Sequence, residues 1–233
     1  GSTAVEVALK MALGFWRNRG EARSRVLALE GAYHGDTIGG MSVGERGVFN
    51  QAYEKLLFDV TAIPFPEAGR EQATLDALEA ACRAGAAAFI VEPIQGKGVN
   101  MPADGYLKSA AELCRRYGTL FVADEIQCGL GRTGRFLAVE HWNVEPDMVL
   151  LAKALSGGHV PVGAVLTRKD LQAHRAIYFT IFDRLVKLLV KGQGPDEAVA
   201  AKPAKEFEAQ WGDSDVFVRA AFKSLWGHYA PDA

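Results

Sequence analysis

Two charged motifs of this sequence directly follow strongly apolar runs. Asp124 and Glu125 come after the run 120–123, and Lys153 follows the five apolar residues 148–152. Lysine is rarely buried without a partner, and burial lowers the pKa of a lysine amine, which makes the amine a usable nucleophile. Such an amine forms Schiff bases with carbonyl compounds, and an acid beside it is suited to a cationic ring nitrogen. Taken singly, each motif is at least as well explained as a hydrated charge at a strand end.

Two glycine-containing segments add groups of other kinds. The small residues of Gly1–Ala8 lead into a helix, whose first N–H groups and dipole suit a phosphate, although a simple helix cap is the commoner explanation. In Gly31–Gly39, Tyr33 and His34 lie between glycines. A flat ring there suits stacking on a planar heterocycle, and the alternative is a loop with a packed tyrosine. A phosphate seat, an aromatic ring, an acid and an amine together indicate a site for pyridoxal 5′-phosphate (PLP).

The segments around these motifs alternate between strand and helix patterns. Short, wholly apolar strands separated by helices predict an α/β fold with a mostly parallel sheet flanked by helices. Ligands of such sheets lie beyond the carboxyl ends of the strands, where the motifs fall. We expect strands at Val26–Leu29, Val60–Phe65, Ala87–Val91, Leu120–Ala123, Asp147–Ala152 and Val162–Leu166, and helices at Thr3–Trp16, Val48–Leu57, Gln72–Ala84 and Tyr106–Tyr117.

The composition of the chain changes near Leu171, and no strand is expected after Leu166. We therefore predict two domains, a PLP-binding large domain at 1–170 and a helical C-terminal extension at 171–233. The helices expected in the extension are His174–Lys191, Glu197–Ala201, Ala204–Gln210 and Val216–Trp226.

Composition narrows the classes of function. The 233 residues carry a formal net charge of -2, which argues against nucleic-acid and anionic-membrane partners. No apolar stretch approaches the roughly 18 residues of a bilayer span. The three cysteines are odd in number and far apart, which indicates free thiols in a reducing cytoplasm and neither disulfides nor a metal site.

Residues 1 to about 170 resemble the class III aminotransferases. The matching strings are GSTAVEVALKMAL, GAYHGDT, VEPIQGKGV, ADEIQCGLGRTG, PDMVLLAKALSGG and PVGAV. The resemblance implies the large domain of fold-type I PLP enzymes, a homodimer, and transamination between an amino donor and an oxo-acid acceptor. The strings do not fix the donor, because the first two lean toward diaminopelargonate aminotransferases and ADEIQCGLGRTG leans toward ornithine and putrescine aminotransferases.

The resemblance also implies roles for individual residues, beginning with the cofactor. Gly1 and Ser2 would hold the PLP phosphate, Tyr33 followed by His34 would lie on the ring, and Gln127 would contact the ring hydroxyl.

Three acidic or basic residues complete the implied site. Asp124 would pair with the pyridinium nitrogen, and Lys153 would form the Schiff base and then move the substrate proton as general base and acid. Glu92, in VEPIQG, would lie near the substrate pocket.

The chain also departs from the family pattern. We find neither a segment before GSTAVEV nor the threonine loop and small domain expected after residue 170, so the large domain is expected to be incomplete and its activity impaired. Tyr178–Leu225 instead resembles the terminal helices of metallo-β-lactamase-fold hydrolases, but no HxHxDH string occurs, so no hydrolase activity is implied. The alternative function is a non-catalytic aminotransferase remnant that acts as an interaction or structural protein.

Overall fold

A computed structural model of the protein describes residues 1–168 and 173–229. The chain divides into two compact units, Gly1–Arg168 and Lys169–Ala233, and each is described by itself. Among the described residues, no helix has the length and apolar character that a membrane span needs.

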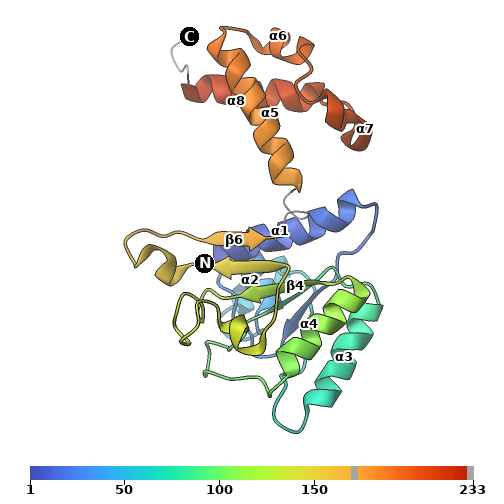
Figure 1. The fold of residues 1–233 in the computed structure, drawn as a ribbon, viewed down its shortest axis with the longest axis vertical. Helices are drawn as coiled ribbons and strands as arrows, with labels where there is room; N and C mark the ends of the chain where they lie inside the picture. The colour runs from blue at the N-terminus through green and yellow to red at the C-terminus, as the bar shows by residue number, and fades with distance from the viewer. Residues whose placement is uncertain (169–172, 230–233) are drawn as a thin grey trace. The chain divides into compact units, whose positions relative to one another are not determined.

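The first unit is built on a six-stranded sheet (Figure 1). Its strand order is β2-β1-β3-β4-β5-β6; β1 to β5 run parallel, and β6 is antiparallel to β5. Strands β1, β3, β4 and β5 are buried along their whole length, which explains their unbroken apolar sequences. The strands are β1 (Val26–Leu29), β2 (Thr61–Ile63), β3 (Ala88–Val91), β4 (Leu120–Asp124), β5 (Met148–Leu151) and β6 (Ala164–Thr167).

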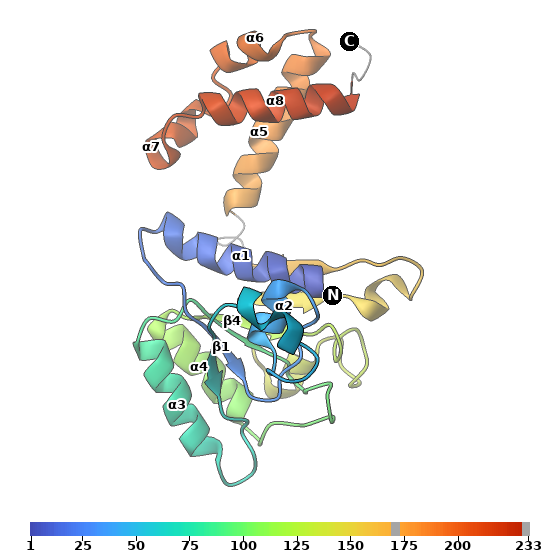
Figure 2. The ribbon, with the colours of Figure 1, turned by 180° about the vertical axis from the view of Figure 1, so that it is seen from behind.

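Helices cover both faces of this sheet. Helices α3 (Glu71–Arg83) and α4 (Tyr106–Tyr117) pack together on one face, over a core that includes Phe89 and Phe121. Helices α1 (Ser2–Asn18) and α2 (Ile38–Val43) cover the other face (Figures 1 and 2). The expected α/β fold with a mostly parallel, helix-flanked sheet is confirmed.

Helix α1 is long because its apolar residues recur at helical spacing. Val5, Leu9, Ala12 and Trp16 are buried on one side of it. The Trp16 indole Nε1–H donates to the carbonyl of Ala87, 2.8 Å away, and this bond ties the end of the helix to the start of β3. Helix α1 also contacts β4, β5 and β6, so its first turn reaches the carboxyl edge of the sheet.

The expected elements agree with the structure apart from the short ones. In the first unit, the three long helices α1, α3 and α4 and the six strands lie within about two residues of their expected bounds. Val48–Leu57 holds only an exposed 3-10 helix, η1 (Gln51–Leu56), and β2 is shorter than Val60–Phe65. The sequence interpretation missed α2, η2 (Ala138–Trp142) and η3 (Lys153–Ser156).

The second unit is helical in all of its described residues that have regular structure. Its elements are α5 (Ala173–Val190), α6 (Pro195–Ala200), η4 (Lys205–Phe207), α7 (Glu208–Trp211) and α8 (Asp215–Tyr229). Leu185 and Phe222 are buried at the centre of a small apolar core between α5, α6 and α8. As expected, the described part of the chain after residue 168 contains no strand.

Candidate active site

Asp124 is the last residue of β4, and its side chain points to the face that α1 covers. Alternation along the strand sends Phe121 and Ala123 into the core under α4, and Asp124 to the opposite face. The carboxylate is buried, and its Oδ2 lies 2.7 Å from Nδ1 of His34, in the loop after β1. Its Oδ1 accepts the backbone N–H of Ile126 at 3.1 Å. Two donors therefore hold an acid at the carboxyl edge of the sheet, where ligands bind.

Glu125 is adjacent to Asp124 in sequence, but its side chain points to the opposite face of the sheet and bonds a different loop. Its two carboxylate oxygens accept the backbone N–H groups of Ala138 and Val139, at 3.0 and 2.8 Å, and the thiol of Cys128 at 3.3 Å. Burial raises the pKa of the Glu125 carboxyl, and the two backbone donors oppose this effect. Glu125 therefore organises the loop that carries η2, and only Asp124 belongs to the site.

Lys153 lies next to Asp124 at the same edge, because β4 and β5 are paired with Asp124 opposite Leu150. The chain leaves β5 with a left-handed φ of 44° at Lys153, the first residue of η3. The Lys153 amine donates to Oε1 of Gln127, which follows β4. Of the two alternatives for Lys153, a buried amine and a hydrated charge at a strand end, the structure shows the second, because its side chain is exposed in the single chain.

The first turn of α1 lies beside the ends of β4 and β5, as the N-terminal mark in Figure 1 shows. A Cβ added to Gly1 would lie 3.0 Å from Cγ2 of Ile126 and 3.6 Å from Cβ of Ala152, so a larger residue there would require the Ile126 side chain to shift slightly. Oγ of Ser2 accepts the N–H of Asp36 at 3.2 Å, which leaves the hydroxyl proton available to another acceptor.

Tyr33 and Glu92 are joined through the backbone. The Tyr33 N–H donates to Oε2 of Glu92 at 3.0 Å, and Oε1 of Glu92 accepts the N–H of Gly96 at 3.0 Å. Burial raises the pKa of the Glu92 carboxyl, while His34 and the two N–H donors lower it. Tyr33 is 50% exposed and its hydroxyl donates to Oδ2 of Asp36 at 2.8 Å, so part of this residue is accessible to a ligand.

These contacts gather every residue of the expected site at one edge of the sheet. A Cβ added to Gly96 would lie 2.9 Å from Cγ of Gln127, which connects the Glu92 loop with the Gln127 and Lys153 pair. The residues brought together are Gly1, Ser2, Tyr33, His34, Glu92, Asp124, Gln127 and Lys153. Their individual roles stay predictions.

Sequence reasoning missed two side chains that organise this edge, Glu6 and Asp36. Glu6 accepts the N–H of Gly39 at 2.6 Å. The Asp36 carboxylate accepts the Tyr33 hydroxyl at 2.8 Å, and the Asp36 backbone N–H donates to Oγ of Ser2. The sequence feature that could have indicated them is the pair of glycines at positions 35 and 39, because glycine allows another segment to lie close to the backbone.

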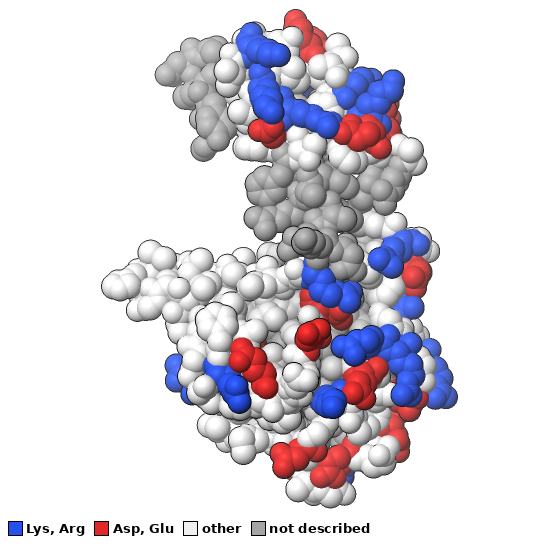
Figure 3. Space-filling model, in the orientation of Figure 1, with Lys and Arg blue, Asp and Glu red and all other residues white. Residues whose placement is uncertain are grey.

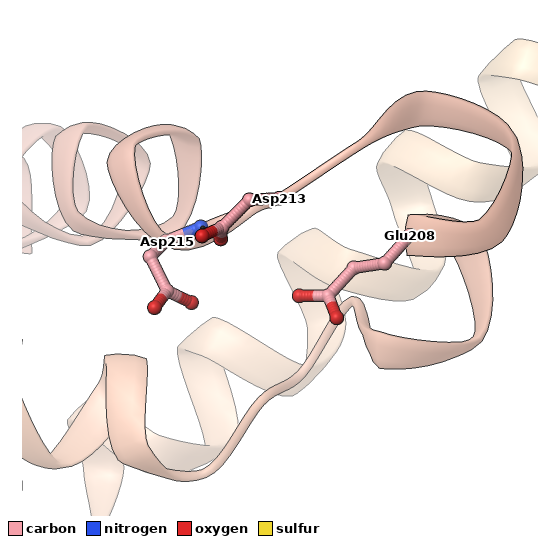
Figure 4. A group of neighbouring side chains, drawn as sticks. All are labelled: Glu208, Asp213 and Asp215. Carbon is pink, nitrogen blue, oxygen red and sulfur yellow. Dashed lines mark hydrogen bonds between the residues drawn. The ribbon is translucent and has the colours of Figure 1, made fainter.

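A second group of acidic residues, in the second unit, is part of a helix start. Glu208, Asp213 and Asp215 are close enough to share a cation (Figure 4). The Lys202 amine already lies 2.6 Å from Asp215 and 3.7 Å from Glu208, and Asp213 accepts the N–H of Asp215 as α8 begins. A lysine of the chain itself therefore pairs with two of the three carboxylates.

Comparison with known proteins identifies the first unit. The family model described as "Aminotransferase class-III" matches residues 1–177. The chain belongs to the class III aminotransferase family. Membership of this family brings PLP as the cofactor.

Relatives of the family agree with this assignment. The chain is 47% identical over 173 residues to the adenosylmethionine-8-amino-7-oxononanoate aminotransferase of Synechococcus elongatus, covering 70% of this chain and 41% of the relative. It is 41% identical over 175 residues to the ornithine aminotransferase of Bacillus cereus, covering 73% and 42%. An amine transaminase from an uncultivated Pseudomonas species, solved in its PLP-bound form, superposes with a TM-score of 0.69 at 37% identity, covering 76% of this chain and 43% of that one.

These matches cover only part of each relative. This chain spans about two-fifths of the length of the curated relatives it matches. The family model ends at residue 177, so the resemblance of the C-terminal segment to metallo-β-lactamase-fold hydrolases has no support from it and stays a prediction.

The residues at the sheet edge fit PLP on their own chemistry. A buried carboxylate with spare lone pairs suits a protonated ring nitrogen, and an exposed amine beside an amide suits the aldehyde and its neighbouring hydroxyl. The glycine-led start of α1 offers free N–H groups to a phosphate. The set has one group for each polar part of the cofactor.

Proposed function

We propose that this chain carries the PLP site of an enzyme that transfers an amino group from an amino acid or diamine to an oxo acid or aldehyde. The observation that carries the proposal is the pairing of β4 with β5, since it sets a buried acid, Asp124, and an exposed amine, Lys153, at neighbouring ends of parallel strands. When bound, PLP supplies an electron-withdrawing ring that makes the substrate carbon next to the amine acidic.

Asp124 holds a proton on the ring nitrogen in this proposal. His34 keeps the carboxylate in place through its 2.7 Å hydrogen bond, and the N–H of Ile126 fixes the other oxygen. An acid held by two donors has little freedom to turn away, so its negative charge stays directed at the cation.

Lys153 moves the proton at the reacting carbon. Its amine is within hydrogen-bond contact of Gln127, and the exposed position lets it swing between the cofactor and the substrate. As a free amine it accepts a proton from the substrate carbon and returns it, acting as general base and then as general acid.

The remaining residues bind and orient. Gly1 and Ser2 hold the phosphate at the start of α1, the Tyr33 ring stacks on the cofactor, and Gln127 bonds the ring hydroxyl. Glu92 borders the substrate side, and its two hydrogen bonds to backbone N–H groups fix the Tyr33 loop.

The substrate is proposed only as a class. The two curated relatives are named for different substrates, 8-amino-7-oxononanoate and ornithine. An amino donor paired with an oxo-acid acceptor is common to the family, and we carry no finer choice to this chain.

A homodimer in the cytoplasm is part of the proposal. The segment 154–163, which comprises most of η3 and the chain that leads to β6, contains no Lys, Arg, Asp or Glu. It forms the uncharged projection from the first unit in Figures 1 and 3. Val160 and Val162 are 60% and 42% exposed. Apolar side chains presented this way are typical of surfaces covered by another subunit, and a subunit there would also cover Lys153.

Spectroscopy with added PLP tests the function. The purified chain should develop a visible absorption band with PLP, and Lys153→Ala should abolish it, whereas Lys108→Ala, at an exposed position on α4, should leave it intact. Addition of an amino donor should then convert the band. A wild-type chain that gives no band would favour the alternative of a non-catalytic remnant that serves as an interaction protein.

A further inference from the structure

Helix α2 begins without a cap from its own sequence. Its N-cap residue, Thr37, makes no side-chain capping bond, and its hydroxyl is buried without a partner among the described residues. The carboxylate of Glu6, from the second turn of α1, takes over this function by accepting the N–H of Gly39 at 2.6 Å. A carboxylate at this position satisfies a free N–H group of the first turn and complements the helix dipole.

A larger residue at position 39 would require the Glu6 carboxylate to move from its contact with α2. A Cβ added to Gly39 would lie 2.5 Å from Oε2 of Glu6. One helical turn earlier on α1, Ser2 accepts the N–H of Asp36, and a Cβ added to Gly35 would lie 2.1 Å from its Oγ. Since positions four apart lie on one side of a helix, Ser2 and Glu6 both form hydrogen bonds with the loop 33–39.

This loop carries the groups that the proposed function places on the cofactor ring. It begins with Tyr33 and His34, and His34 holds Asp124. The first turn of α1, which makes one of these contacts, carries the proposed phosphate seat, Gly1 and Ser2. The distance between the phosphate seat and the ring-binding groups is therefore set by the contacts of Ser2 and Glu6.

We propose that Glu6 is a positioning residue for PLP, which fixes the loop 33–39 against the first turns of α1 and so holds the ring-binding groups in register with the phosphate seat. The proposal rests on the proposed function for the identity of the ligand. Glu6 acts through the loop, and it touches neither the cofactor nor the substrate.

Three variants of the full chain separate this role from general stability. Glu6→Ala removes the acceptor, Glu6→Gln keeps one oxygen that can accept the Gly39 N–H, and Lys10→Ala is the matched control at an exposed position one turn further along α1. We expect Glu6→Ala to speed hydrogen exchange at the Gly39 amide in the PLP-free chain. We also expect it to weaken PLP binding by about tenfold, the scale of a lost hydrogen bond to a charged group.

The spectroscopic readout is the circular dichroism that bound PLP acquires from its surroundings. At saturating PLP this band should shrink in Glu6→Ala, recover largely in Glu6→Gln, and be unchanged in Lys10→Ala. Gly39→Ala disturbs the same contact from α2, because its Cβ would displace the Glu6 carboxylate, and it should also reduce the band. This second variant tests the proposal if Glu6→Ala does not fold.

The outcomes distinguish this inference from the function on which it rests. If the wild-type chain binds PLP and Glu6→Ala and Gly39→Ala bind it with wild-type affinity and dichroism, the positioning role is wrong and the proposed function stands. If the wild-type chain itself gives no PLP band, the proposed function fails, and the role of Glu6 fails with it.

Discussion

His34 Nδ1 lies 2.7 Å from Asp124 Oδ2, a hydrogen bond that joins residues 90 positions apart at the carboxyl edge of the sheet. Both side chains are buried, and Nε2 of His34 has no partner in the described part of the chain. The ring therefore makes one polar contact, through Nδ1–H donating to the carboxylate. A histidine with one contact in a buried site has its orientation set by that contact.

Replacement of His34 by alanine should destabilise the first unit. The Asp124 carboxylate would stay buried with the Ile126 N–H as its remaining partner, at a cost of about 1–3 kcal/mol in the free energy of unfolding. Urea unfolding at neutral pH measures this loss. Lys108→Ala, at an exposed position on α4, is the control, and equal stability of the two variants would show that the His34 contact contributes nothing.

Glu92 gives a pH dependence with a definite sign. Burial raises the pKa of its carboxyl above the ordinary value of 4.5, against the opposing effects of His34 and two N–H donors. The folded chain therefore binds more protons than the unfolded chain between these two pKa values, so the contribution is stabilising below pH 4.5 and is lost as pH rises through the folded pKa.

The measurement is the free energy of unfolding of wild type relative to Glu92→Gln as a function of pH. The free energy of unfolding of wild type minus that of Glu92→Gln should be constant below about pH 4.5. Above that pH it should decrease, because wild type loses stability relative to the variant. Glu92→Gln also loses a hydrogen bond at all pH values, which shifts the curve without changing its slope. Glu54→Gln, on the exposed η1, should run parallel to wild type. A difference that is constant across this range would contradict the buried-carboxyl argument.

Sequence patterns predicted the sheet well because its central strands are buried on both sides. Fully apolar runs such as 88–91 have no other stable location, so their bounds could be read directly. Helix α2 could not be read, since IGGMSV is short, has two glycines and lacks an amphipathic pattern. Its first turn depends on Glu6, more than thirty residues earlier, and no local rule detects such a contact.

The sequence predicted which residues gather at this edge of the sheet but not their geometry, and their roles stay predictions. The edge of a parallel sheet indicated where Asp124 and Lys153 would meet. The left-handed turn at Lys153, which makes its side chain exposed, depends on how β5 passes into η3 and has no sequence signature in LLAKALSGG. The opposite directions of Asp124 and Glu125 follow from strand alternation, but the partners of Glu125 lie in a loop that no periodicity describes.

Asp124 and Glu125 are adjacent in sequence but have different partners, so their substitution should have different effects. Asp124→Asn keeps the shape of the side chain and removes the charge proposed for the ring nitrogen, so transamination should fall by roughly a hundredfold or more while the fold persists. Glu125→Gln places an NH2 group against backbone N–H donors and the Cys128 thiol, so it should lower the free energy of unfolding by about 1–3 kcal/mol.

Two measurements on both variants check this division. The absorption band with PLP and the rate of its conversion by an amino donor report on the site, and urea unfolding reports on the fold. The expected pattern is a changed band for Asp124→Asn, with some loss of stability because its NH2 group must face the His34 ring or the Ile126 N–H. Glu125→Gln should show a normal band with reduced stability. If Glu125→Gln instead alters the band as much as Asp124→Asn does, the assignment of Glu125 to the η2 loop is wrong.

The core of the second unit supports a last prediction. Phe222 is fully buried against the helices α5 and α6, so Phe222→Ala should destabilise this unit by about 3–5 kcal/mol through lost burial and a cavity. Hydrogen exchange should then rise in α5 and α8 while β3 and β4 keep their protection, because the two units have separate cores. Phe182→Ala, at a side chain 44% exposed on α5, is the matched control and should change exchange little. A rise in exchange that spreads through the sheet would show that the two units unfold together, which would contradict their separate stability.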